Sequence, residues 1–260
     1  MPELRLELRD HVAELIIDNP ERRNALSPEM WIRLPELLAA LEAEDDVLVL
    51  VVRGAGEHFS SGAEITALDR ILFDPALPDG GLVSRGEDAL AAFSKPVIAA
   101  IDGSCVGGGI GLAAACDLRI ASDRARFAVP PAKLGILYPV GSLERLVALT
   151  GAAAAKRLLL TAESVDANEA LRLGLVGEVV PAAELHARAH ELAARMTRLS
   201  QSSLRAEKQI IALCGVDMAA ARRADADWQA KAGALRDRAE GVAAFREGRP
   251  PEFATTEGDR

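Results

Sequence analysis

Hydrophobic and polar positions alternate with a period of two at the start of the chain, over residues 4–8 and 11–16. This alternation is typical of half-buried strands and predicts an opening strand pair. A Ser-Pro-Glu sequence at residues 27–29 then combines a capping hydroxyl, a first-turn proline and a favourable negative charge. Leucines recurring on one face extend this predicted helix to about residue 44.

Two continuous apolar runs, at residues 47–52 and 96–101, predict strands that are covered on both faces. Shorter runs at 118–121 and 125–127 predict further strands. Between these runs, two prolines and two glycines in residues 74–81 predict a mobile loop. The alternation of strands with helical segments favours βαβ units and an α/β fold.

The second half of the chain has a mostly helical pattern. The pattern is almost wholly helical from residue 141 onward, with periodic segments expected at residues 168–173, 181–199, 203–213, 218–231 and 240–247. Earlier in the chain, helices are expected at residues 89–93 and after the glycines at 107–109, ending near residue 116. We therefore expect a β/α core over residues 1–195 and a helical C-terminal segment over residues 196–260.

Composition and charge narrow the classes of protein. A formal net charge of −9 argues against a nucleic-acid partner, which needs basic surface. The three cysteines lie far apart, as is usual in a reducing compartment. The charged N-terminus does not resemble a secretory signal, and the uncharged run at residues 103–116 is too short to span a membrane. We expect a cytoplasmic protein that does not bind membranes.

Two segments of small residues, 59–65 and 103–110, favour close approach of a ligand to the backbone. In the second segment, three consecutive glycines at 107–109 remove every Cβ before a predicted helix, whose positive end points to the same place. Two such amides would stabilise a developing oxyanion. Glycine runs also occur where a helix packs tightly on a sheet, so that alternative stays open. A dinucleotide site is disfavoured because the Gly-x-Gly-x-x-Gly spacing does not match convincingly.

Several segments resemble, in order along the chain, the crotonase (enoyl-CoA hydratase/isomerase) family. They are residues 19–27, 59–65, 102–121, 167–180 and 240–253. The resemblance implies a crotonase-like core of ββα spiral turns and a C-terminal helical trimerisation region. It also implies a homotrimer or a homohexamer formed as a dimer of trimers. The expected substrate is an acyl-CoA thioester, with no cofactor beyond the coenzyme A of the substrate.

The family resemblance also assigns the expected site residues. The amides of Ala63 and Gly108 are expected to form the catalytic oxyanion hole. The expected substrate-binding residues are Arg22, Arg23, Ala25, Ala63, Ile65, Val106, Gly107, Gly108, Pro130 and Pro131.

Both glutamates of the family's hydratases are missing at the corresponding positions, which hold Gly111 and Pro131. Neither residue has a titratable side chain, so efficient hydration by the usual acid–base pair is not expected. A third position, where other members carry a catalytic aspartate, holds Pro139.

Tyr138, the only tyrosine in the chain, lies in a Leu-Gly-x-x-Tyr stretch that resembles methylmalonyl-CoA decarboxylases. Decarboxylation needs no base, because loss of CO₂ leaves an enolate directly. We therefore expect Tyr138 to be a catalytic hydrogen-bond or proton donor. The alternative is a pocket wall whose hydroxyl bonds a backbone carbonyl. In those decarboxylases a histidine stands where this chain has Ala63.

Other functions stay open. An enoyl-CoA isomerase or weak hydratase would use Glu87, Glu144 or ordered water, whereas Glu64 would orient the first loop. A catalytically silent acyl-CoA-binding protein is a further alternative. His186 and His190 have the i, i+4 spacing of metal ligands, but no third ligand accompanies them and no metal is expected.

Overall fold

The computed structural model describes residues 2–73, 75–77 and 79–253. A six-stranded sheet in the order β1-β2-β3-β4-β6-β9 forms the core, with β1 antiparallel to β2 and the other neighbours parallel. Its strands are β1 (Glu3–Arg9), β2 (Val12–Asp18), β3 (Val49–Gly54), β4 (Val97–Ile101), β6 (Leu118–Ser122) and β9 (Glu178–Val180). A smaller sheet contains β5 (Ser104–Val106), β7 (Arg126–Ala128) and β8 (Ser164–Asp166).

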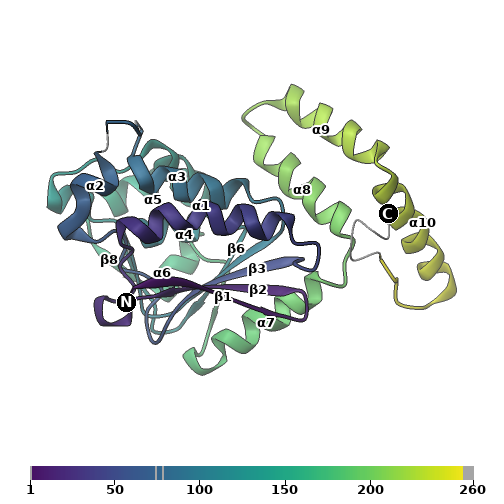
Figure 1. The fold of residues 1–260 in the computed structure, drawn as a ribbon, viewed down its shortest axis with the longest axis horizontal. Coiled ribbons are helices and arrows are strands. Elements are labelled where there is room, and N and C mark those ends of the chain that lie inside the picture. The colour runs from purple at the N-terminus through teal and green to yellow at the C-terminus, as the bar shows by residue number, and fades with distance from the viewer. Residues whose placement is uncertain (1, 74, 78, 254–260) are drawn as a thin grey trace.

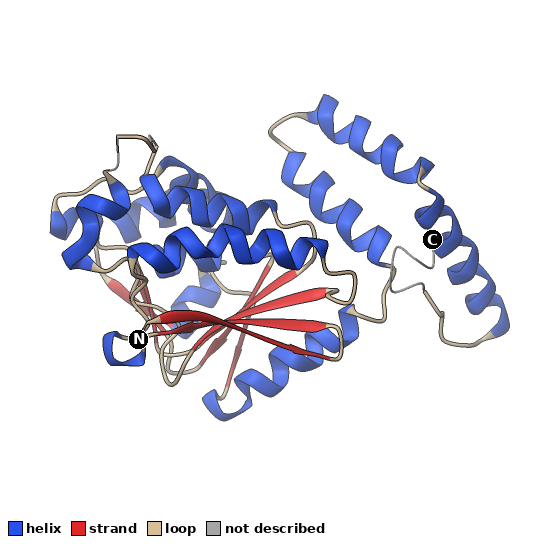
Figure 2. Ribbon diagram, viewed as in Figure 1, coloured by secondary structure: helices blue, strands red, loops and turns tan. Residues whose placement is uncertain are grey.

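Helices cover both faces of the large sheet (Figures 1 and 2). In β3, Leu50 and Val52 belong to the main hydrophobic core, whereas Val49 and Val51 pack in a second cluster with residues of α7. This division follows from the period of two, and it confirms the expected two-sided burial. The helices of this region are α1 (Pro28–Ala43), α2 (Leu68–Leu72), α3 (Gly81–Ala92), α4 (Gly108–Ala115), α5 (Val140–Thr161), α6 (Ala167–Arg172) and α7 (Leu185–Met196).

Three C-terminal helices contact one another and extend away from the sheet (Figure 1). Lys208 of α8 connects them to the sheet region, since its Nζ donates to Asp117 Oδ2 at 2.7 Å. The three helices are α8 (Gln201–Leu213), α9 (Met218–Ala230) and α10 (Ala232–Glu247). The expected fold class, an α/β sheet core followed by C-terminal helices, is confirmed. The division at residue 195 and the role of these helices in trimerisation stay predictions.

Several expected boundaries were wrong. The helix expected at residues 89–93 is α3, which begins at Gly81 because Gly80 enters it through a positive φ of 97°. Likewise, α10 begins at 232 rather than 240, and α7 ends at Met196 rather than 199. The loop expected at 74–81 includes two residues, 74 and 78, outside the described residues.

Two strands escaped the sequence pattern, β5 and β8, because three residues carry too little alternation to be recognised. The start of α1 is confirmed: the Ser27 hydroxyl accepts from the Met30 amide at 3.3 Å. Among the described helices, none is long and apolar enough to cross a bilayer.

Candidate active site

Backbone hydrogen bonds fix the first small-residue loop between its neighbours. Ser60 pairs with β5, since its amide donates to Ser104 O and its carbonyl accepts from Val106 N, both at 2.9 Å. Leu26 then bridges the two sides of Ala63, donating to Gly62 O at 2.8 Å and accepting from the Glu64 amide at 2.9 Å. These hydrogen bonds therefore hold the loop on both sides of Ala63, while the Ala63 amide takes no part in them.

The glycines serve close packing as well as access. Gly107 adopts φ 54° and ψ −120°, a conformation that L side chains rarely adopt. A Cβ on Gly109 would lie 2.5 Å from Ser60 O, and one on Gly62 would lie 2.8 Å from the Gly108 nitrogen. The glycine run therefore serves both purposes that the sequence allowed. Gly109 permits tight packing, and Gly107 and Gly108 leave the backbone accessible.

The Ala63 and Gly108 amides come together at the start of α4. A Cβ built on Gly108 would lie 3.5 Å from the Ala63 nitrogen, which places the two peptide groups side by side. Among the described residues, neither amide has a hydrogen-bond acceptor. Gly108 is the first residue of α4, so its N–H also carries the positive end of the helix dipole. This geometry can hold an anionic oxygen.

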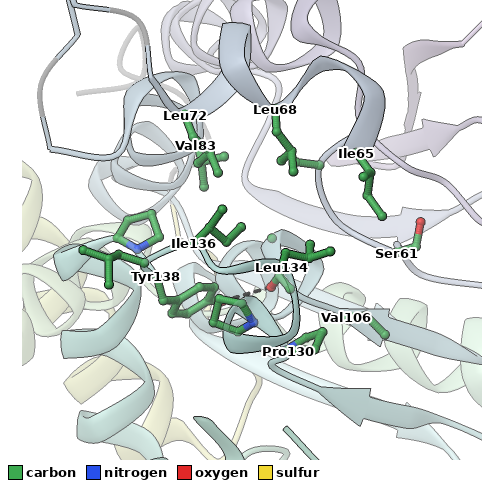
Figure 3. Close-up of a pocket in the computed structure, with 16 residues that line it drawn as sticks. Ser61, Ile65, Leu68, Leu72, Val83, Val106, Pro130, Leu134, Ile136 and Tyr138 are labelled. Atoms are coloured by element: carbon green, nitrogen blue, oxygen red, sulfur yellow. Dashed lines mark hydrogen bonds between the residues drawn. The ribbon is translucent and has the colours of Figure 1, made fainter. Parts of the chain in front are cut away.

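A largely apolar cavity of about 130 Å³ opens beside these amides (Figure 3). Side chains from the short 3₁₀ helix η2 (Ile65–Ala67), from α2 and α3, and from the segment before α5 form its walls. The expected site residues that line it are Ala63, Ile65, Val106, Gly107, Gly108, Pro130, Pro131 and Tyr138. Eight of the expected site residues therefore line one cavity.

The remaining expected substrate-binding residues lie outside the cavity lining. Arg22 is exposed and ion-paired with Glu64, and Arg23 is exposed in a left-handed conformation with φ 51°. Ala25 is buried. Their contact with coenzyme A stays a prediction.

Tyr138 lies in the cavity wall, and its hydroxyl donates to Gly107 O at 2.9 Å (Figure 3). Burial, followed by the nearby Glu87 charge, raises the pKa of Tyr138 well above its ordinary value. The phenol is therefore a donor at neutral pH, as expected. Its present acceptor is a backbone carbonyl, which is the alternative that the sequence left open.

Gly111 and Pro131 occupy the positions where the family resemblance expects glutamates. A Cβ on Gly111 would lie only 1.8 Å from Oε1 of Glu87. The Glu87 side chain reaches this place from α3 and is completely buried. Burial raises the pKa of Glu87 to about 7, although hydrogen bonds from Ser142 and Arg145 favour the charged form. A carboxyl group therefore lies beside Gly111, carried by a different helix.

The partners of Glu87 were not identified from the sequence. Ser142 Oγ donates to Glu87 Oε2, and Arg145 Nη2 lies 3.0 Å from the same oxygen. Arg145 also bonds Asp88 Oδ1 at 2.9 Å. The signal that could have revealed them was Gly111 itself, because a missing side chain in a buried helix leaves space that another group must fill.

Two other carboxylates of the sequence-based alternatives point elsewhere. Glu64 bonds Arg22 and Thr66 outside the cavity, and Glu144 is exposed near the N-terminal end of α5. His190 pairs with Glu14, remote from the cavity. Across the described part of the chain, no group of three metal-binding side chains occurs.

Comparisons with known proteins identify the family. Residues 7–256 match the model of the family described as enoyl-CoA hydratase/isomerase. A short-chain-enoyl-CoA hydratase of Clostridium acetobutylicum is 36% identical over 225 residues, 85% of this chain and 86% of that protein. A crotonyl-CoA hydratase of Syntrophomonas wolfei is 35% identical over 251 residues, 95% of this chain and 96% of that protein. A crystal structure of an enoyl-CoA hydratase/isomerase family member superposes with a TM-score of 0.89, at 39% identity and 98% coverage of both chains.

Proposed function

Because the chain belongs to the enoyl-CoA hydratase/isomerase family, we propose that it stabilises an acyl-CoA enolate with the amides of Ala63 and Gly108. One observation supports this most directly: two adjacent amides without acceptors open onto an apolar cavity. In such surroundings a fixed N–H dipole interacts more strongly with a developing charge than it would in water. Losing one such donor typically costs about 10²–10³ in rate.

The reaction that best fits this cavity is decarboxylation of a malonyl-type CoA. The bond between the α-carbon and the carboxylate breaks, CO₂ leaves, and the electron pair moves into the thioester. The charge on the thioester oxygen is then held by the two amides until the α-carbon takes up a proton. No base is required for the first step, and among the described residues no carboxylate or imidazole lines the cavity.

The coenzyme A part of the substrate would lie outside the cavity, along the exposed side of the first loop. Arg22 and Arg23 provide positive charge there for its phosphates, and the buried Ala25 follows them closely in the chain. Exposed apolar side chains on the C-terminal helices support the proposed homotrimer or dimer of trimers, since large exposed patches mark interfaces. Among these side chains are Ile211, Met218, Val242 and Phe245.

A substrate panel tests the reaction. Purified protein is incubated with methylmalonyl-CoA, crotonyl-CoA and a 3-enoyl-CoA, while CO₂ release, hydration and double-bond migration are followed. We expect CO₂ release, and we expect Tyr138→Phe to weaken it. Rapid crotonyl-CoA hydration without CO₂ release would exclude decarboxylation as the main activity. Tight acyl-CoA binding without any turnover would identify a silent binding protein instead.

One observation favours a second candidate, an enoyl-CoA isomerase. Burial raises the pKa of Glu87 to about 7, which suits a group that both takes and returns a proton near neutral pH. In isomerisation, one carbon loses its proton and the double bond shifts, after which the proton returns two carbons further along. Migration of the 3-enoyl-CoA double bond, without CO₂ release from methylmalonyl-CoA, would favour this candidate.

A further inference from the structure

Glu87 is a buried carboxyl group for which the packing of the core gives no reason. It lies in the middle of α3, completely buried, where an apolar side chain would avoid the cost of desolvation. Its position depends on Gly111 of α4, because any Cβ there would overlap Oε1. The carboxyl group of Glu87 therefore occupies the space that Gly111 leaves free, although the two residues are 24 positions apart in sequence.

The hydrogen bonds of Glu87 go to only one of its two carboxyl oxygens. Ser142 and Arg145 both bond Oε2, and among the described residues Oε1 has no hydrogen-bond partner. Oε1 is also the atom nearest to Gly111. A proton on this carboxyl group would thus reside on Oε1 and point towards the first turns of α4.

Tyr138 converges on the same turns of α4 from the cavity side. Its hydroxyl donates to Gly107 O at 2.9 Å, and a hydrogen bond from the Gly111 backbone favours the phenolate. Tyr138 thus reaches α4 at Gly107 and Glu87 Oε1 reaches it at Gly111, and the charge of Glu87, after burial, contributes to the raised pKa of Tyr138. Tyr138 lines the cavity, whereas Glu87 lies behind it.

We propose that Glu87 and Tyr138 form a coupled proton-transfer pair that serves the acyl cavity through the space left by Gly111. The functional part of this inference rests on the proposed enolate chemistry. After CO₂ leaves, the Tyr138 hydroxyl gives its proton to the α-carbon of the enolate. Protonated Glu87 replaces that proton through Oε1, and the resulting carboxylate takes a proton from water. Glu87 acts through Tyr138 and so positions and supplies the proton rather than touching the substrate.

The charges around the pair decide its pH dependence. Arg145 of α5 favours the Glu87 carboxylate and Asp88 of α3 opposes it, but burial outweighs both. Cys105 of β5 lies near Tyr138, and burial raises the pKa of its thiol, so that it stays neutral. Glu87 is therefore the group near Tyr138 that changes charge around pH 7, and turnover by decarboxylation falls as the pH rises through that value.

The unique tyrosine allows a direct test. In protein labelled with ¹³C at the tyrosine ring carbon that bears the hydroxyl, Tyr138 gives one signal. We expect this signal to shift in one step near pH 7 in the wild type and to stay constant in Glu87→Gln. Asp88→Asn is the matched control, since Asp88 also lies on α3 and bonds Arg145. It should keep the step, moved to lower pH because Asp88 raises the pKa of Glu87.

Kinetics on the substrate panel complete the test. We expect Glu87→Gln to lower kcat about 10²-fold or more, to leave KM within a few-fold, and to remove the fall of kcat above pH 7. The proposal would be overturned by a Tyr138 signal that changes with pH in the same way in the wild type and in Glu87→Gln. A Glu87→Gln variant with wild-type kcat and pH profile would also overturn it. If the signal titrates through Glu87 while the wild type turns over no substrate, the pair stands and the proposed function fails.

Discussion

The candidate site has two parts, which meet α4 at Gly108 and at Gly111. One part is formed by the backbone and the other by side chains. The backbone part consists of the Ala63 and Gly108 amides, and the side-chain part consists of Glu87, Tyr138 and the space beside Gly111. The backbone part depends only on the path of the chain, which glycines and hydrogen bonds to Leu26 and Ser60 fix. The side-chain part depends on one functional group reaching the right place, whichever element carries it.

Because of this difference, the proposed oxyanion donors can stay on the same segments while the carboxyl group is carried by a different helix. An amide cannot be supplied by another helix without moving the chain, but a carboxyl group can. Gly111 leaves a space beside α4, and Glu87 of α3 occupies it. Variants that act on one part alone should therefore give different kinds of effect.

The largest effect is expected from Gly108→Pro, which removes a backbone donor. Proline is tolerated in the first position of a helix, so α4 should still form. We expect kcat to fall by about 10²–10³-fold with the fold intact, measured by turnover and circular dichroism. Val140→Pro is the control, because Val140 is the exposed first residue of α5 and does not line the cavity. Equal losses in both variants would contradict the assignment of the donor.

The next effect concerns the stability of the side-chain part. Folding raises the pKa of Glu87 from 4.5 to about 7, mainly by burial, so the folded state binds its proton more tightly than the unfolded chain. The free energy of unfolding therefore falls as the pH rises through this window, by about 1.4 kcal/mol per pH unit and about 3 kcal/mol in all.

Urea unfolding of the wild type and Glu87→Gln at several pH values measures this contribution. The variant has no group to titrate at this position, so the difference between the two curves should change across the window between 4.5 and 7. Asp88→Asn keeps Glu87 and should still differ from Glu87→Gln across this window, with the change moved to lower pH because Asp88 raises the pKa of Glu87. Parallel curves for the wild type and Glu87→Gln would show that the pKa of Glu87 is unchanged by folding.

A smaller effect should connect α3 and α4 directly. Gly111→Ala places a methyl group 1.8 Å from Glu87 Oε1 and should destabilise the protein by about 1–3 kcal/mol. In a Glu87→Ala background the overlap disappears, and the same change should be neutral or stabilising by up to about 1 kcal/mol, since alanine favours helix. The cycle is measured by urea unfolding. Equal costs in both backgrounds would show that Glu87 does not occupy the space.

The smallest effect is expected at Glu64, which directly follows the oxyanion residue Ala63. Its carboxylate bonds Arg22 and Thr66 outside the cavity. Exposed ion pairs of this kind contribute at most about 1 kcal/mol. Glu64→Gln should leave kcat within about twofold, measured on the same substrate panel. A loss approaching that of Glu87→Gln would place a catalytic carboxylate in the first loop instead.

Local patterns in the sequence determined much of the fold. Alternation predicted β1 and β2, the Ser-Pro-Glu sequence predicted the start of α1, and the apolar run at 47–52 predicted a strand buried on both faces. These signals are local, because they arise from backbone propensity and from the periodicity of burial. The start of α3 could not be predicted, since its N-terminus follows a glycine turn without a capping side chain.

For the candidate site, the resemblance of the sequence to the family predicted a set of backbone and apolar residues, and eight of them line one cavity. The same resemblance predicted that two carboxylates of the family's hydratases are replaced by Gly111 and Pro131. Only the tertiary structure decided where another carboxyl group lies, because the contact between Glu87 and Gly111 joins two helices. The elevated pKa of Glu87 likewise comes from burial between α3, α4 and α5, which no local pattern records.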